Sequence, residues 1–203
     1  ANNFNTNLGL IYSVFTISAV IFVLLDSHRD ITFKNKSDSL ITSVLIALVA
    51  VVGFIALSNY LIIPGTKSLL DLLSASTPVL ANDPLTNKIV FGILVASSET
   101  LFFFVYLFDL LASIIGVRID KSNLKTGKLW ALIIGIALLF VFFHITAKLT
   151  GILADEGAVL ATVFFMGIVS MVLVVWRKQA VEALLFHIIL NSLAIGLFII
   201  PSL

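Results

Sequence analysis

The chain has 203 residues, of which 60% are hydrophobic and only 11% are charged, and its mean hydropathy is +1.18. A soluble domain carries about 25% charged residues, so this composition excludes an ordinary soluble protein and predicts an all-α, polytopic transmembrane helical bundle in a lipid bilayer. The net charge of +1 suggests no nucleic-acid partner. The absence of cysteine excludes disulfides, thiolate metal sites, iron–sulfur clusters and covalently attached c-type haem.

About six apolar stretches are long enough to cross a bilayer. They cover residues 8–25, 40–63, 89–117, 129–147, 159–176 and 181–200. The third is longer than a bilayer requires, so we expect it to be tilted, kinked or partly outside the lipid. Between the second and third, residues 67–82 contain Leu-rich turns interrupted by Lys67, Asp71 and Pro78, which predicts an interfacial or re-entrant helix, with a full extra span as the alternative. Residues 1–203 are expected to form a single integral membrane domain.

Basic residues are concentrated in alternate loops, after the first, third and fifth predicted spans. These loops hold Arg29, Lys34, Lys36, Arg118, Lys121, Lys125, Lys128, Arg177 and Lys178. Because cytoplasmic loops carry an excess of Lys and Arg, this distribution predicts that the N-terminus and the C-terminus both lie outside. No organelle signal is visible, which favours a prokaryotic cell membrane.

Among the polar residues inside the apolar stretches, four are candidates for a site: Glu99, His144, His187 and Asn191. A carboxylate buried in hydrocarbon is costly unless it is paired, protonated or bound to metal. His187 and Asn191 are four residues apart and share one helical face. We therefore expect a polar site assembled between helices, although the helical rise predicts a depth difference of roughly 10 Å between the two histidines.

This set of side chains is compatible with several functions. Glu99, His144 and His187 form a three-ligand set of the kind that catalytic zinc uses, with one position left open for water. Without a metal, Glu99 can itself activate water as a general base, and Asn191 can donate a hydrogen bond to a developing oxyanion. A bis-histidine haem on His144 and His187 is a further alternative. The structural alternatives are a protonated carboxyl, hydrogen-bonded imidazoles and an interhelical amide.

Three short patterns occur in order along the chain: Ser98-Glu99, Phe140-x-x-x-His144 and His187-x-x-x-Asn191. This order resembles that of the CPBP intramembrane proteases, also called the Abi or type II CAAX prenyl endopeptidase-like family, whose motifs are EExxxR, FxxxH and HxxxN/D. The resemblance covers about residues 90–195. It implies an endopeptidase that cleaves membrane-associated peptides with water activated by Glu and His, with or without a divalent metal such as zinc.

The first motif departs from the family pattern. If Ser98-Glu99 aligns with the glutamate pair, Ser98 replaces the first glutamate and Phe103 replaces the arginine. If Glu99-Thr100 aligns instead, Thr100 replaces the second glutamate and Phe104 replaces the arginine. In this resemblance the family's first glutamate is the water activator, so the first register predicts an inactive or altered enzyme. The missing arginine and the missing glutamate pair favour the alternative function, a catalytically inactive pseudoenzyme that serves as an accessory or scaffold subunit of a membrane complex.

Overall fold

The computed structural model describes residues 17, 31, 39–61, 89–149 and 157–194, and over these residues the protein is all-α, as predicted, with no sheet. The long helices are α2 (Leu40–Leu61), α8 (Gly127–Leu149) and α9 (Gly157–Arg177), and α10 (Val181–Ala194) is shorter. A composite helix consists of η1 (Val90–Val95), α6 (Ala96–Glu99), η2 (Thr100–Leu107) and α7 (Phe108–Ile115). A short 3₁₀ turn, η3 (Lys121–Lys125), precedes α8.

Four helices are long and apolar enough to cross a membrane, which supports an integral membrane protein. They are Leu40–Tyr60, Gly92–Ile115, Gly127–His144 and Gly157–Arg177, and Val181–Ala194 is a shorter apolar helix. The predicted second to fifth spans therefore agree with the structure to within a few residues. The predicted span at 8–25 and the predicted interfacial helix at 67–82 lie outside the described residues, apart from Ile17, and the predicted sixth span is described only as far as Ala194. The orientation stays a prediction.

The unusually long third span contains two stretches of π-helix, which flank the α-helical turn of α6. In α6, the hydroxyl of Ser97 donates to the carbonyl of Ile93 at 2.6 Å, and the hydroxyl of Ser98 donates to the carbonyl of Leu94 at 2.8 Å. Serine hydroxyls that bond carbonyls of the preceding turn compete with the regular helical ladder. Interruptions of this kind occur frequently at functional sites, and here they surround Glu99.

The end of the composite helix follows a common capping pattern. Gly116 has a left-handed conformation with φ of 66°, which glycine adopts without steric cost. The N–H of Val117 then reaches back to the carbonyl of Ala112 at 2.8 Å, as in a Schellman motif. The predicted span at 89–117 therefore ends as a helix at Ile115.

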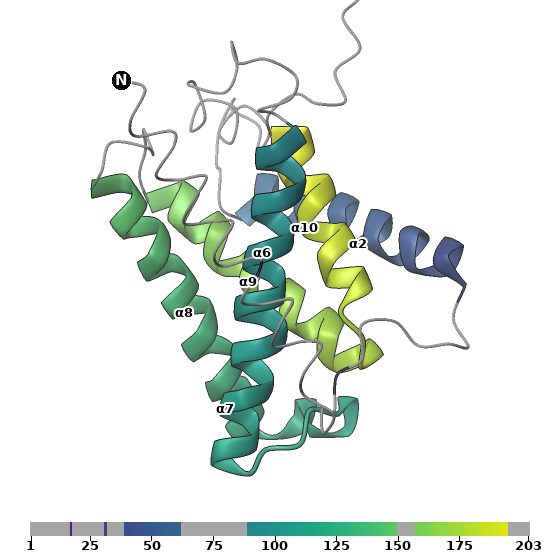
Figure 1. Ribbon diagram of the computed structural model, residues 1–203, viewed down its shortest axis with the longest axis vertical. Coiled ribbons are helices and arrows are strands. Elements are labelled where there is room, and N and C mark those ends of the chain that lie inside the picture. The colour runs from purple at the N-terminus through teal and green to yellow at the C-terminus, as the bar shows by residue number, and fades with distance from the viewer. Residues whose placement is uncertain (1–16, 18–30, 32–38, 62–88, 150–156, 195–203) are drawn as a thin grey trace, which may run out of the picture.

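Figure 1 shows the composite helix upright in the middle of the bundle, with α8 on one side and α10 and α2 on the other. α8 packs against α9, and α10 packs against α9, α2 and the composite helix. Gly167 on α9 faces both neighbouring helices, and a Cβ atom added there would make ordinary contacts at 3.5 Å with Ala137 on α8 and with Phe104 on the composite helix. Small residues at such contacts allow membrane helices to pack closely.

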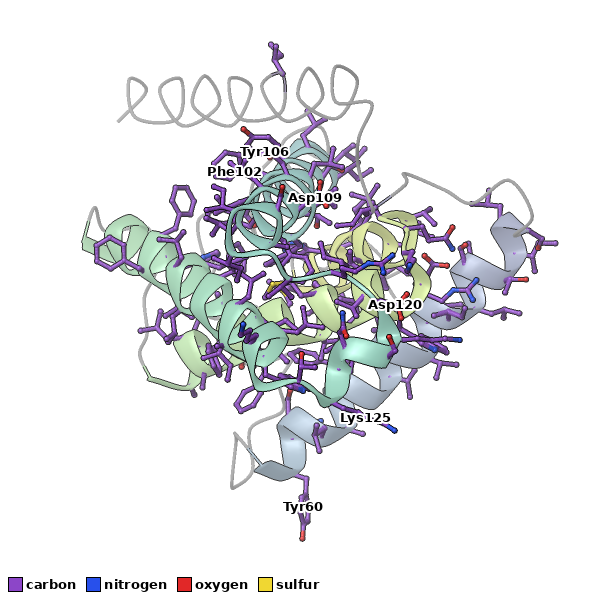
Figure 2. The ribbon with its side chains drawn as sticks, turned by 90° about the horizontal axis from the view of Figure 1, so that it is seen from below. Tyr60, Phe102, Tyr106, Asp109, Asp120 and Lys125 are labelled. Atoms are coloured by element: carbon purple, nitrogen blue, oxygen red, sulfur yellow. The ribbon has the colours of Figure 1, made fainter. Side chains whose placement is uncertain are left out.

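One end of the bundle, at the bottom of Figure 1, carries the connections α7–α8 and α9–α10. The Nζ atom of Lys178 is 2.7 Å from Oδ2 of Asp120, which joins these two connections. The other carboxylate oxygen of Asp120 accepts hydrogen bonds from the backbone N–H and the hydroxyl of Ser122. Figure 2 looks onto this end of the molecule, with Asp120 and Lys125 labelled.

This ion pair predicts a dependence of stability on acid. Lys178, followed by Ser122, holds the pKa of the Asp120 carboxyl well below its usual range. A depressed pKa stabilises the fold above the unfolded value of about 3.9, and the stabilisation is lost as the pH falls below it. In thermal unfolding, Asp120→Asn is expected to be less stable than the wild type at pH 7 by a small margin, because the pair is exposed, and this margin should shrink below about pH 4. Lys125→Ala is the control, and an equal margin at every pH would contradict the prediction.

Candidate functional site

The centre of the site is a buried pair of ionisable side chains from two helices. Glu99 ends α6, and His187 lies in the middle of α10. Oε2 of Glu99 is 3.6 Å from Nε2 of His187, and the two side chains are only 6% and 1% exposed. The structure therefore brings together two of the predicted site residues that are far apart in the sequence.

Thr100 is a third member of the site that the sequence interpretation gave no role. Its hydroxyl oxygen lies 3.0 Å from Nδ1 of His187, and Thr100 is fully buried. Glu99 and Thr100 thus contact opposite nitrogens of one imidazole ring. The available signal was its position directly after Glu99, where one register of the first motif has the second glutamate.

His144 reaches the same region from α8 through the ring of Phe140. The rings of Phe140 and His144 lie 4.5 Å apart, and those of Phe140 and His187 lie 6.2 Å apart. Both imidazoles therefore lie beside one phenylalanine, and the predicted depth difference does not keep them apart. The half-buried His144 donates from Nδ1 to the carbonyl of Phe140 at 2.9 Å, a bond within its own helix.

Aromatic side chains surround the buried pair. Phe104 is fully buried, with its ring 4.9 Å from that of Phe140 and 6.2 Å from that of His187. The ring of Phe103 lies 5.2 Å from that of Phe140. The two candidate replacements for the arginine of the first motif are therefore both apolar packing residues beside the site. In such an apolar environment a hydrogen bond is stronger than in water, and an unsatisfied polar group is more costly.

Asn191 is half-buried on α10, one turn after His187. Within the described part of the chain, its side chain makes no hydrogen bond, so the structure keeps it near the site without joining it to Glu99. The amide can therefore still donate to a bound substrate. Its role in the site stays a prediction.

The predicted three-ligand metal set on Glu99, His144 and His187 stays a prediction. Among the described residues, no group of three or more His, Asp and Glu side chains is close enough together to hold a metal ion. Glu99 approaches His187, and Nδ1 of His144 donates to a backbone carbonyl, a bond that metal-binding histidines commonly make with the ring nitrogen that does not face the metal. A metal on Glu99, His144 and His187 would require these side chains to rearrange.

Comparison with known proteins agrees with the motif order. Residues 81–193 match the family model described as type II CAAX prenyl endopeptidase Rce1-like, and this match covers more than half of the chain. The chain therefore belongs to the CPBP, or Rce1-like, family of intramembrane proteases. No curated protein and no solved structure matches it significantly.

Proposed function

We propose that this protein is an intramembrane endopeptidase in which Glu99 activates the attacking water. The observation that carries this proposal is the approach of the buried Glu99 carboxyl group to Nε2 of His187, at 3.6 Å, inside a chain of this family. A buried carboxylate next to an imidazole can take a proton from water and pass it on. The substrate class is a membrane-associated peptide, and a prenylated CAAX peptide is the form suggested by the family.

The directions of neighbouring side chains support the Glu99-Thr100 register of the first motif. Glu99 and Thr100 both contact His187, whereas the hydroxyl of Ser98 donates to carbonyls of its own helix, Leu94 and Val95. In this register the water-activating glutamate of the family is retained as Glu99. Thr100 then stands in the place of the second glutamate.

The proposed reaction assigns a step to each side chain. Glu99 takes a proton from a water molecule, and the resulting hydroxide attacks the scissile carbonyl carbon. The proton held by Glu99 then passes to the leaving amine as the peptide bond breaks. His187 and Asn191 are suited to donate hydrogen bonds to the oxygen that becomes negative, and His144 to help position the substrate. A zinc-assisted form on Glu99, His144 and His187 is the variant implied by the family resemblance, and no step here depends on it.

A non-catalytic role as an accessory or scaffold subunit is the second candidate. The observation in its favour is the replacement of the motif's arginine by a fully buried phenylalanine, Phe104 in the favoured register. A buried aromatic side chain stabilises packing and contributes no charge to a reaction. A scaffold would retain the bundle and a stable partner while losing proteolysis.

The two candidates differ in their response to the loss of one carboxylate. Glu99→Gln keeps the shape of the side chain and removes the general base, so we expect proteolysis to fall by about 10²-fold or more. The measurement is quantitative identification of new protein N-termini in membranes from cells that express the wild type or the variant. Cleavages made by the wild type should disappear in Glu99→Gln.

Asp109→Asn is a matched control, because it makes the same chemical change on the same helix outside the site. Figure 2 shows Asp109 with Phe102 and Tyr106 on the side of that helix that faces away from the rest of the described bundle. This control should leave the cleavages in place. Identical sets of N-termini from the wild type, Glu99→Gln and cells without the protein would contradict the endopeptidase and favour the scaffold.

A further inference from the structure

The contact between Thr100 and His187 allows the position of a proton to be deduced. Both side chains are buried, with His187 1% exposed and Thr100 fully covered, and their polar atoms lie 3.0 Å apart. A neutral imidazole carries its proton on either Nδ1 or Nε2, and the other nitrogen is an acceptor. The hydrogen bonds around the ring decide which form is present.

Among the described residues, the hydroxyl group of Thr100 has one hydrogen-bond partner, Nδ1 of His187. Some hydroxyls on these helices donate to a carbonyl of their own helix, as Ser97 does to Ile93 and Thr162 does to Ala158. Thr100 makes no such bond, and within the described part of the chain Nδ1 of His187 is its hydrogen-bond partner. A buried hydroxyl proton without an acceptor is costly, so Thr100 donates and Nδ1 accepts.

We infer that Thr100 is a positioning residue that holds His187 in the tautomer with its proton on Nε2. His187 then presents an N–H donor to Oε2 of Glu99, 3.6 Å away. Nε2 is buried and has no hydrogen-bond partner of normal length among the described residues, so this donor remains available. The inference about the tautomer stands on geometry, and its consequence for catalysis rests on the proposed endopeptidase function.

The tautomer determines what His187 can do. An imidazole binds a metal through an unprotonated nitrogen, and Nε2 is the nitrogen that faces Glu99. With its proton on Nε2, His187 is a hydrogen-bond donor at this position and not a ligand. It can stabilise the Glu99 carboxylate before the reaction and the negative oxygen of the substrate during it. This explains how a hydroxyl can serve at the motif position where the family has its second glutamate.

Nitrogen NMR of the whole protein in detergent, labelled with ¹⁵N-histidine, tests the tautomer directly. The chain has three histidines, and a His187→Gln sample assigns the signals of interest. In the wild type and in Thr100→Ser, we expect Nδ1 of His187 to resonate as an unprotonated ring nitrogen and Nε2 as a protonated one. Thr100→Val removes the hydroxyl with little change of shape, and it should bring the two shifts together or exchange them.

Thr162→Val is the matched control, because Thr162 is also buried and, as far as the structure is described, its hydroxyl bonds a carbonyl of its own helix. It should leave the His187 signals unchanged. A wild type with the proton on Nδ1, or a Thr100→Val spectrum equal to that of the wild type, would overturn the inference. If Thr100→Val and Thr162→Val both lose the spectrum of the folded protein, valine disrupts folding at either buried threonine. Thr100→Ser then decides, because it must keep the wild-type tautomer.

The effect of Thr100 on catalysis is measured separately, through kcat and KM. If the wild type cleaves peptides, Thr100→Val is expected to lower kcat by roughly tenfold with little change in KM, and Thr100→Ser to restore it. Absence of cleavage by the wild type would count against the proposed function and leave the tautomer result intact. The predicted tautomer together with unchanged kcat in Thr100→Val would refute the positioning role alone.

Discussion

Phe140→Ala is expected to lower the free energy of unfolding by about 3–5 kcal/mol and to disorder the site. The ring of Phe140 is fully buried and lies against the rings of Phe103 and Phe104 and of both site histidines. Its removal leaves a cavity that the surrounding helices fill only in part. The two imidazoles then lose the surface that holds them at one place.

Phe142→Ala provides a matched control on the same helix. Phe142 is 61% exposed, so the same truncation creates no cavity and should change stability by less than about 0.5 kcal/mol. The measurement is unfolding of the purified proteins in mixed detergent, followed by circular dichroism. Equal stabilities of the two variants would show that Phe140 does not act as the central packing residue.

Glu182→Ala is expected to destabilise the protein by about 3 kcal/mol, because it removes the acceptor at a buried junction of three segments. Oε1 of Glu182, at the start of α10, accepts from the Ser43 hydroxyl of α2 at 3.1 Å and from Nε of Arg177 of α9 at 3.3 Å, and also from the amide of Gln179. Glu182 is fully buried. The contacts of Glu182 with Ser43, Arg177 and Gln179 all come from the fold.

Glu182→Gln separates the loss of the acceptor from the loss of the charge. The amide oxygen of glutamine can still accept from Ser43, so this variant should lose clearly less stability than Glu182→Ala in the same unfolding experiment. Because α10 carries His187 five residues later, Glu182→Ala should also broaden the His187 NMR signals. A Glu182→Ala protein as stable as Glu182→Gln would contradict the role of this carboxylate as the shared acceptor.

The agreement between predicted and observed helices has a simple physical origin. Spans must be apolar and about 20 residues long because hydrocarbon cannot hydrogen-bond the backbone, so the second to fifth spans were readable from hydropathy alone. The ends of the helices were predicted less accurately, because they depend on local hydrogen bonds. Gly116 ended the third span before the apolar run did.

The site was only partly predictable, because spacing along one helix is visible in the sequence and contacts between helices are not. The contact between Phe140 and His144 and the shared face of His187 and Asn191 follow from a spacing of four residues on one helix, which the sequence contains explicitly. The metal set on Glu99, His144 and His187 does not follow from such spacing, and it stays a prediction. Whether three side chains from three helices converge depends on how the helices cross, and spacing within one helix does not determine that.

The sequence by itself determined the membrane class, most of the spans, the family and the identity of Glu99 and His187 as buried polar residues, because each of these depends on composition or on local spacing. Only the tertiary structure decided that Glu99 and Thr100 contact opposite sides of the His187 ring. That contact joins residues almost ninety positions apart, and its geometry depends on the packing of α10 against a helix with π turns. The hydroxyl of Thr100 is part of the site because this packing brings it within 3.0 Å of Nδ1 of His187.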